Sequence, residues 1–155
     1  MTDRMVIDAS IVAKWFLSDE TDRDAADKLL LLLLSDDIEM SAPRVLLYEV
    51  CGLLTKACLT QVRETGANRL SLQTAEDCVR QLYELPIQIV DADANAARSA
   101  LEMAVKFHKT FNDMTYVGLA QQLQCQWCTA DRKFFEAFPP DFPAQLAVEL
   151  SSLGW

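Results

Sequence analysis

The segment RMVIDASIVAKWFL, residues 4–17, decides the fold of this chain. Its first four residues form a mostly apolar run that is typical of a short buried strand, and the run ends at Asp8. Ser10 can then cap a helix that continues from Ile11 to Leu17. A strand that leads directly into a helix is the first half of a βαβ unit, so the opening of the chain predicts an α/β protein.

The rest of the chain alternates between the same two patterns. We expect helices over 22–35, from Pro43 to about Cys58, over 72–84, over 93–107, from Asn112 to about 123, and briefly after Asp131. We expect strands over 38–41, 87–90 and 126–129, with an edge strand over 146–150. Strands separated by helices favour a parallel sheet with helices on both faces.

Length and composition indicate an ordinary globular protein. The chain has 155 residues, the size of one domain, so we expect a single domain over 1–155. Its composition, 51% hydrophobic and 24% charged, excludes disordered and low-complexity classes. The apolar run 29–34 is far shorter than the roughly 20 residues that span a bilayer, and we see no signal peptide. We therefore expect a cytoplasmic protein without a membrane segment.

The net charge of −9 bears on the kind of partner. Non-specific affinity for nucleic acid comes from Lys and Arg that neutralise phosphates, so this charge argues against a general nucleic-acid coat protein. It does not exclude a nuclease, because bound metal would offset part of the acidity and basic residues lie close in sequence to the acids described below. These basic residues are Lys14, Arg44, Lys56, Lys109, Arg132 and Lys133. An acidic surface also suits a basic protein partner.

Four acidic residues, far apart in the sequence, each lie beside an apolar stretch. They are Asp8 in MVIDAS, Glu49 in LLYEV, Asp113 in FNDMTYV and Asp131 in CTADRKF, and we call them the four acids. Asp8 and Asp131 directly follow strands, and ligands of open α/β sheets bind outside the carboxyl ends of the strands. Asp113 and Glu49 lie on apolar flanks of their helices. A carboxylate held away from water needs positive compensation, and divalent metal binding would supply it.

Each of the four acids also has a purely structural explanation. Asp113 and Asp131 could each serve a helix start, Asp8 could be a turn residue, and Glu49 could extend into solvent. The coincidence of two acids at strand ends and two on buried helix faces favours the metal site. The other acids near these segments are assigned to capping and solvent: Asp91, Asp93 and Glu102.

Five cysteines, at 51, 58, 78, 125 and 128, form no disulfide framework. Cys125 and Cys128 match the CxxC spacing, but a structural zinc site would need a second pair or nearby histidines, and His108 is the only histidine. Residues three apart on a strand also point to opposite faces. We therefore interpret the cysteines as packing residues.

At the four acids the chain resembles the PIN-domain nucleases, and most closely their VapC-type toxin branch. The resemblance spans nearly the whole length, and its most specific parts are VIDASIVAKWFL (6–17) and NDMTYVGLAQQLQCQWCTADRKF (112–134). The LLYEV segment around Glu49 is a weaker match but correctly placed. There are two departures: His108-Lys109-Thr110 stands where relatives often carry a glycine-containing turn, and the CQWC strand is unusual.

The resemblance implies a PIN-like three-layer fold with a central, mostly parallel sheet flanked by helices. It implies a metal-dependent endoribonuclease that uses Mg²⁺, with Mn²⁺ as a substitute. The residues that it assigns to catalysis and metal binding are Asp8, Glu49, Asp113 and Asp131, with Ser10 and Thr129 as supporting hydroxyls. It further implies an RNA substrate, a small antitoxin protein as partner in a type II toxin–antitoxin pair, and a homodimer.

Two other functional classes remain open. One is a non-catalytic PIN-like interaction module. The other is a phosphotransfer or nucleotide-binding α/β domain, which would also place Asp8 after the first strand. Against it, the four glycines, at 52, 66, 118 and 154, form no phosphate-binding loop.

The number of metal ions also remains open. A single ion would generate the hydroxide, whereas two ions about 3.5–4 Å apart would stabilise both the attacking and the leaving oxygen. Without metal, two carboxylates about 4 Å apart repel by about 4 kcal/mol at an effective dielectric constant of 20. We therefore expect at least one of the four acids to have a raised pKa in the metal-free protein.

Overall fold

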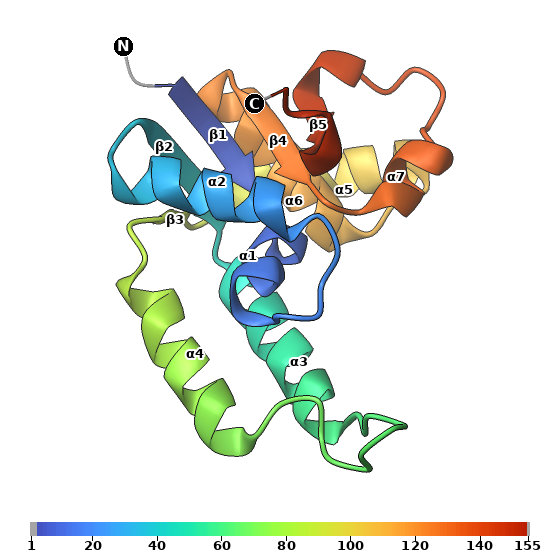
Figure 1. Ribbon diagram of the computed structural model, residues 1–155. Coiled ribbons are helices and arrows are strands. Elements are labelled where there is room, and N and C mark those ends of the chain that lie inside the picture. The colour runs from blue at the N-terminus through green and yellow to red at the C-terminus, as the bar shows by residue number, and fades with distance from the viewer. Residues whose placement is uncertain (1–2, 155) are drawn as a thin grey trace.

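Five strands form one sheet in the computed structural model, which describes residues 3–154 (Figure 1). The strands lie in the order β3-β2-β1-β4-β5, and all four pairings are parallel. Their bounds are β1 Asp3–Ile7, β2 Ile38–Pro43, β3 Gln88–Val90, β4 Gln126–Thr129 and β5 Ala147–Glu149. The expected α/β fold is confirmed, including the edge strand near the end of the chain.

Seven α-helices connect and cover these strands. Their bounds are α1 Ala9–Phe16, α2 Arg23–Leu34, α3 Val45–Leu59, α4 Leu72–Glu84, α5 Ala94–Phe107, α6 Phe111–Leu123 and α7 Arg132–Glu136, with 3₁₀ turns at Ala144–Leu146 and Leu150–Ser152. Helix α6 packs against β1, β2 and β4 on one face of the sheet, with α5 beside it. Figure 1 shows α2 on the opposite face, so the sheet is the middle of three layers. No helix among the described residues is long and apolar enough to cross a membrane.

The core lies where the two central strands meet α6. Val6 and Ile7 of β1 have no exposed surface, and Trp127 of β4 is 1% exposed. The Trp127 ring stacks on Tyr116 of α6 at a centroid distance of 6.5 Å. It also meets Phe134 of α7 edge-on at 5.0 Å. This packing fixes α6 and α7 relative to the carboxyl ends of β1 and β4.

Helices α3 and α4 form a hairpin that projects away from the sheet (Figure 1). The two helices contact each other, and α3 also contacts α1 and β2 near its start. Between them, residues 60–71 make a turn that is pinned to α3, since the Leu70 amide donates to the Ala57 carbonyl at 3.2 Å. Glu49 lies in the first half of α3, near the sheet end of the hairpin.

Three helix starts differ from the sequence-based expectation. Asp8, rather than Ser10, is the N-cap of α1, because its carboxylate accepts the Ser10 amide at 3.0 Å. Pro43 is the last residue of β2, and α3 begins two residues later, at Val45. Thr110, rather than Asn112, caps α6 by accepting the Asp113 amide at 3.1 Å. In α1 and α6, two residues with suitable capping side chains lie two positions apart, and the hydrogen bonds of the folded chain show which one caps the helix.

The strand order creates a switch point between β1 and β4. From β1 the chain winds through β2 to β3 on one side, and it returns to β4 and β5 on the other. Ile7 pairs with Cys128, so the residues that follow β1 and β4 leave the sheet at the same level. Crevices at such switch points are the usual ligand sites of open α/β sheets.

Candidate carboxylate site

Asp8 lies at the switch point, in a network of hydroxyl groups. Its carboxylate accepts hydrogen bonds from the amide and the hydroxyl of Ser10. The Ser10 hydroxyl lies 3.3 Å from that of Thr129 and accepts the Ala130 amide at 2.9 Å. Ser10 and Thr129 thus join the start of α1 to the end of β4, and they hold Asp8 in one orientation.

The Asp8 carboxyl is the most deeply buried of the four acids, at 7% exposure. Burial raises its pKa from the ordinary value of 3.8 to about 6, because the low-polarity surroundings disfavour the charged form. Hydrogen bonds from Ser10 and Thr129 oppose this rise, and the charge of Asp113 adds a smaller upward contribution. Asp8 is therefore a carboxylate held at a free-energy cost, which a bound cation would relieve.

Asp113 lies between two others of the four acids. It sits in the first turn of α6, half-buried, and burial raises the pKa of its carboxyl. Repulsion by Asp131 adds to the rise, while the Thr110 hydroxyl and the charge of Lys109 lower it. Asp113 also acts on Asp8. Asp8, Asp113 and Asp131 therefore form one electrostatic cluster, in which Asp8 follows β1, Asp131 follows β4 and Asp113 belongs to α6.

The expected rise in pKa without metal is confirmed for Asp8 and Asp113, but its main cause is different. Sequence reasoning attributed the rise to repulsion between neighbouring carboxylates. Burial is the larger cause for both groups, and repulsion is a smaller one. Withdrawal of a carboxylate from water penalises its charge even before a second acid is considered.

Asp131 has a structural role that is compatible with a place in the site. Its side chain caps α7 by accepting the Lys133 amide at 3.0 Å, and its own amide donates to the Thr129 hydroxyl at 3.1 Å. The carboxylate is otherwise exposed. One oxygen therefore serves the helix, and the other faces solvent without a protein donor.

Glu49 reaches the site through α6. The Tyr116 hydroxyl donates to Oε2 of Glu49 at 2.6 Å, and the Asn112 side-chain amide donates to Oε1 at 3.2 Å. Tyr116 is 1% exposed, and the negative charge of Asp8 contributes to raising its pKa. Burial and the bond to Glu49 raise the pKa of Tyr116, so the phenol stays protonated as a donor. Tyr116 therefore lies between Glu49 and the rest of the cluster.

The sequence did not predict a place in the site for Tyr116, and it predicted Asn112 only as the start of a helix. The available signal was their spacing, since they flank Asp113 at three residues after it and one residue before it. A residue three positions along a helix lies on the same side as Asp113. That Tyr116 meets Glu49 depends on how α3 packs beside α6, which no local pattern reveals.

The remaining acids and cysteines behave as expected. Asp93 caps α5 by accepting the Ala96 amide at 2.9 Å, and Asp91 pairs with Arg44. All five cysteines are free thiols, and burial raises the pKa of Cys128. The turn between β1 and α1 contains no glycine, so it offers no backbone cradle for a phosphate.

The donor set suits a hard divalent cation, although the side chains are not closed around one. Within residues 3–154, no three Asp, Glu, His or Cys side chains are arranged to hold a metal ion as they stand. The reason lies in the hydrogen bonds just described, because Glu49 and Asp131 are turned toward protein donors. Carboxylate oxygens are nevertheless the ligands that Mg²⁺ and Mn²⁺ prefer. The chemistry of the cluster fits such an ion, since three of the four acids act on one another electrostatically.

Comparison with known proteins supports this description of the fold. The profile of the PIN domain family matches residues 5–138. A search of curated protein sequences finds none that matches the chain. Among solved structures, the toxin VapC20 of Mycobacterium tuberculosis, described as cleaving the sarcin–ricin loop, is 15% identical over 89% of this chain and 98% of its own, with a TM-score of 0.64.

Two further structures show the same architecture. PAE2754 from Pyrobaculum aerophilum is 16% identical over 99% of this chain and 93% of its own, with a TM-score of 0.65. A toxin–antitoxin complex from Klebsiella pneumoniae is 14% identical over 94% of this chain and 97% of that one, with a TM-score of 0.62. At these identities the likeness concerns the fold.

Proposed function

The chain belongs to the PIN-domain family, and from that premise we propose that it is a metal-dependent endoribonuclease. One observation carries the proposal: Asp8 after β1, Asp131 after β4 and Asp113 of α6 form one electrostatic cluster at the switch point of the sheet. Three carboxylates on separate elements, two of them with raised pKa values, are expensive to assemble unless a cation is bound there.

The four acids are the proposed ligands of Mg²⁺, with Mn²⁺ as a substitute. Asp8 and Asp113 would provide the buried oxygens, and Asp131 an exposed one. Glu49, held by Tyr116, would bind the ion directly or through a water molecule. A bound ion, or a pair of ions, would activate water as the nucleophile and neutralise charge during in-line displacement at phosphorus.

The other residues of the site orient these carboxylates. Ser10 donates twice to one oxygen of Asp8, and Thr129 supports Ser10 from the end of β4. Tyr116 fixes one oxygen of Glu49 and limits its rotation. Fixed ligands lose less conformational entropy when an ion binds, and such outer partners typically affect metal affinity about 10–100-fold.

We propose RNA as the substrate and a small antitoxin protein as the partner. Support comes from proteins of the same fold, since VapC20 is described as a toxin that cleaves the sarcin–ricin loop, and the Klebsiella structure is a toxin–antitoxin complex. The net charge of −9 suits a basic protein partner. A homodimer and a cytoplasmic location remain predictions of the same kind.

The test is cleavage of total RNA by the purified protein with Mg²⁺ or Mn²⁺, beside an EDTA control and the Asp8→Ala variant. Discrete fragments that require both the metal and Asp8 are the expected result. A Mn²⁺ titration by calorimetry, run on the same proteins, should show binding that Asp8→Ala weakens strongly. Metal-independent cleavage, or cleavage that survives in Asp8→Ala, would contradict the proposal.

A non-catalytic PIN-like interaction module is the alternative that one observation favours. Among the described residues no three acids are already closed around a metal position. The Mn²⁺ titration separates the two functions, because an interaction module has no need to bind the ion at the four acids. Absence of both metal binding and cleavage would favour the module.

A further inference from the structure

The six basic residues near the four acids in sequence divide into two groups in the structure. Three of them are engaged elsewhere. Lys14 is 5% exposed, and its ammonium donates to the Thr21 carbonyl at 2.7 Å. Arg44 makes two hydrogen bonds to Asp91, and Arg132 pairs with Asp22 at 2.7 Å. Each of these cations is in an ion pair with an acid outside the four: Lys14 with Glu20, Arg44 with Asp91 and Arg132 with Asp22.

The other three have no ion pair among residues 3–154: Lys56, Lys109 and Lys133. Most ion pairs of the described residues are made by arginines instead. Apart from the ion pairs of Lys14 and Arg44, the described residues form eight, and all eight use an arginine. These arginines include residues of α2, α4 and α5. Lys106 and Arg63 also have no ion pair among the described residues, so the three lysines are distinguished by their positions relative to the four acids.

Two of these lysines lie directly beside members of the four acids. The backbone amide of Lys133 donates to the Asp131 carboxylate at 3.0 Å, while its side chain is exposed. Lys109 precedes Asp113 by four residues and lies close enough to influence its carboxyl. Each lysine therefore accompanies a different carboxylate of the cluster.

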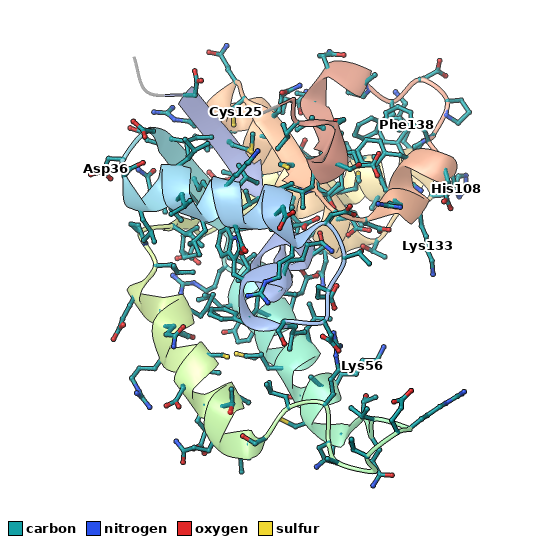
Figure 2. All side chains as sticks on the ribbon, in the orientation of Figure 1. Asp36, Lys56, His108, Cys125, Lys133 and Phe138 are labelled. Atoms are coloured by element: carbon teal, nitrogen blue, oxygen red, sulfur yellow. The ribbon has the colours of Figure 1, made fainter. Side chains whose placement is uncertain are left out.

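Lys56 stands in the same relation to Glu49. It follows Glu49 by seven residues in α3, which is two helical turns, so the two side chains lie on the same side of the helix. Lys56 is exposed, and no hydrogen bond of its side chain is observed. Figure 2 shows Lys133 projecting from α7 and Lys56 projecting from α3 on the same side of the molecule.

Lys109 differs from the other two because it is held in place. Its ammonium donates to the Ala137 carbonyl at 3.3 Å and lies 5.0 Å from the centroid of the Phe134 ring. The carbonyl at the end of α7 and the ring face both favour a cation at this position. The set thus combines one lysine held by two contacts with two lysines that are exposed.

We propose that Lys133, Lys109 and Lys56 bind the sugar–phosphate backbone of a single RNA strand that crosses the four acids from α7 to α3. The inference rests on the proposed function and identifies the path of its substrate. Carboxylates repel phosphates, so an acidic site needs cations on either side to retain the flanking phosphates while metal neutralises the central one. Flexible lysines suit this task because they bind phosphate as point charges without demanding one geometry.

The test measures RNA binding separately from cleavage. A short fluorescein-labelled single-stranded RNA of mixed sequence is titrated with wild-type protein in Ca²⁺, and anisotropy is recorded at several salt concentrations. A gel run afterwards checks that the probe is intact. Each phosphate contact contributes about 0.7 to the slope of log affinity against log salt for single strands. The double variant Lys56→Ala/Lys133→Ala should therefore lose about 1.4 from this slope, and it should bind several-fold more weakly at low salt.

Matched variants distinguish a specific path from general charge. Arg80→Ala/Arg98→Ala removes the same charge from exposed arginines of α4 and α5 and should leave the slope unchanged. Lys56→Arg/Lys133→Arg should keep the wild-type slope. An unchanged slope in the alanine double variant, an equal loss in the arginine control, or no RNA binding by the wild type would each overturn the inference.

Failure of this inference and failure of the proposed function can be told apart. If the wild type cleaves RNA with Mg²⁺ but the lysine variants bind and cleave with unchanged KM, the nuclease stands and the path is wrong. If binding depends on the lysines as stated but no metal-dependent cleavage occurs, the path stands and the nuclease function fails. Thermal melts of all variants check that they are folded.

Discussion

The Tyr116 hydroxyl donates a 2.6 Å hydrogen bond to the Glu49 carboxylate and joins two helices that lie 67 residues apart in sequence at these positions. Tyr116 is buried against Trp127, so its ring cannot move without disturbing the core. Glu49 is thereby linked to a residue of the buried core, although it belongs to the projecting α3–α4 hairpin. A residue of α6 therefore orients the Glu49 carboxylate, which belongs to α3.

Replacement of Tyr116 by Phe should weaken metal binding while keeping the fold. The phenyl ring can still stack on Trp127, but Glu49 loses its donor and gains rotational freedom. We expect the Kd for Mn²⁺ to rise about 10–100-fold, as is typical for loss of an outer partner of a metal ligand. Calorimetric titration measures this. An unchanged Kd with a lowered melting temperature would show that the phenol serves stability alone.

Replacement of Asp113 by Asn should stabilise the metal-free protein and abolish metal-dependent cleavage. Burial and the charge of Asp131 make the Asp113 carboxylate unfavourable, and an amide of the same shape removes that charge. We expect the melting temperature in EDTA to rise by roughly 2–4 °C, which corresponds to about 1 kcal/mol for a chain of this length. Glu76→Gln, on the exposed face of α4, is the matched control and should not shift it. A variant that melts below the wild type in EDTA would count against this account.

The stability of the metal-free protein should depend on pH through Asp8. Its pKa is 3.8 ordinarily and about 6 in the folded state, so between these values the folded protein binds more protons than the unfolded chain. The Asp8 contribution to the free energy of unfolding therefore falls as pH rises through this window and is constant above it. The full effect is about 3 kcal/mol at most.

The measurement is urea unfolding in EDTA at several pH values, for the wild type and for Asp8→Asn. The difference in unfolding free energy between them isolates Asp8 from acids with lowered pKa values, such as Asp19 and Asp91, which act in the opposite direction. Asp8→Asn should become the relatively more stable protein as pH rises from about 4 to 7. A difference that does not vary with pH would refute the raised pKa.

Replacement of Ser10 by Ala should destabilise the protein and loosen Asp8. The Ser10 hydroxyl donates to the Asp8 carboxylate and accepts the Ala130 amide, so its loss leaves a buried charge with fewer donors and one amide without its acceptor. We expect a loss of about 1.5–3 kcal/mol in the free energy of unfolding, together with weaker Mn²⁺ binding. Ser18→Ala, at an exposed position without a side-chain hydrogen bond, is the control and should be neutral in urea unfolding. Equal stability of the two variants would contradict the bridging role.

The sequence was informative wherever the signal was local. Short segments rich in apolar residues predicted all five strands, most clearly β1, where Met5, Val6 and Ile7 are buried. The caps were less certain, since Asp8 and Ser10 are both good N-caps and lie only two residues apart. In the folded protein the Ala130 amide donates a hydrogen bond to the Ser10 hydroxyl oxygen, and Asp8 is the residue that caps α1.

By itself, the sequence determined the alternation of strand and helix, the two acids that follow strands and the two that lie within helices. These follow from side-chain periodicity and from the chemistry of single residues. Only the tertiary structure decided the strand order, which brings β1 beside β4 and so joins Asp8 to Asp131 through Thr129. It also decided which cations are paired and which remain unpaired beside the acids. Contacts between residues distant in sequence depend on how whole elements pack, and no local pattern encodes that packing.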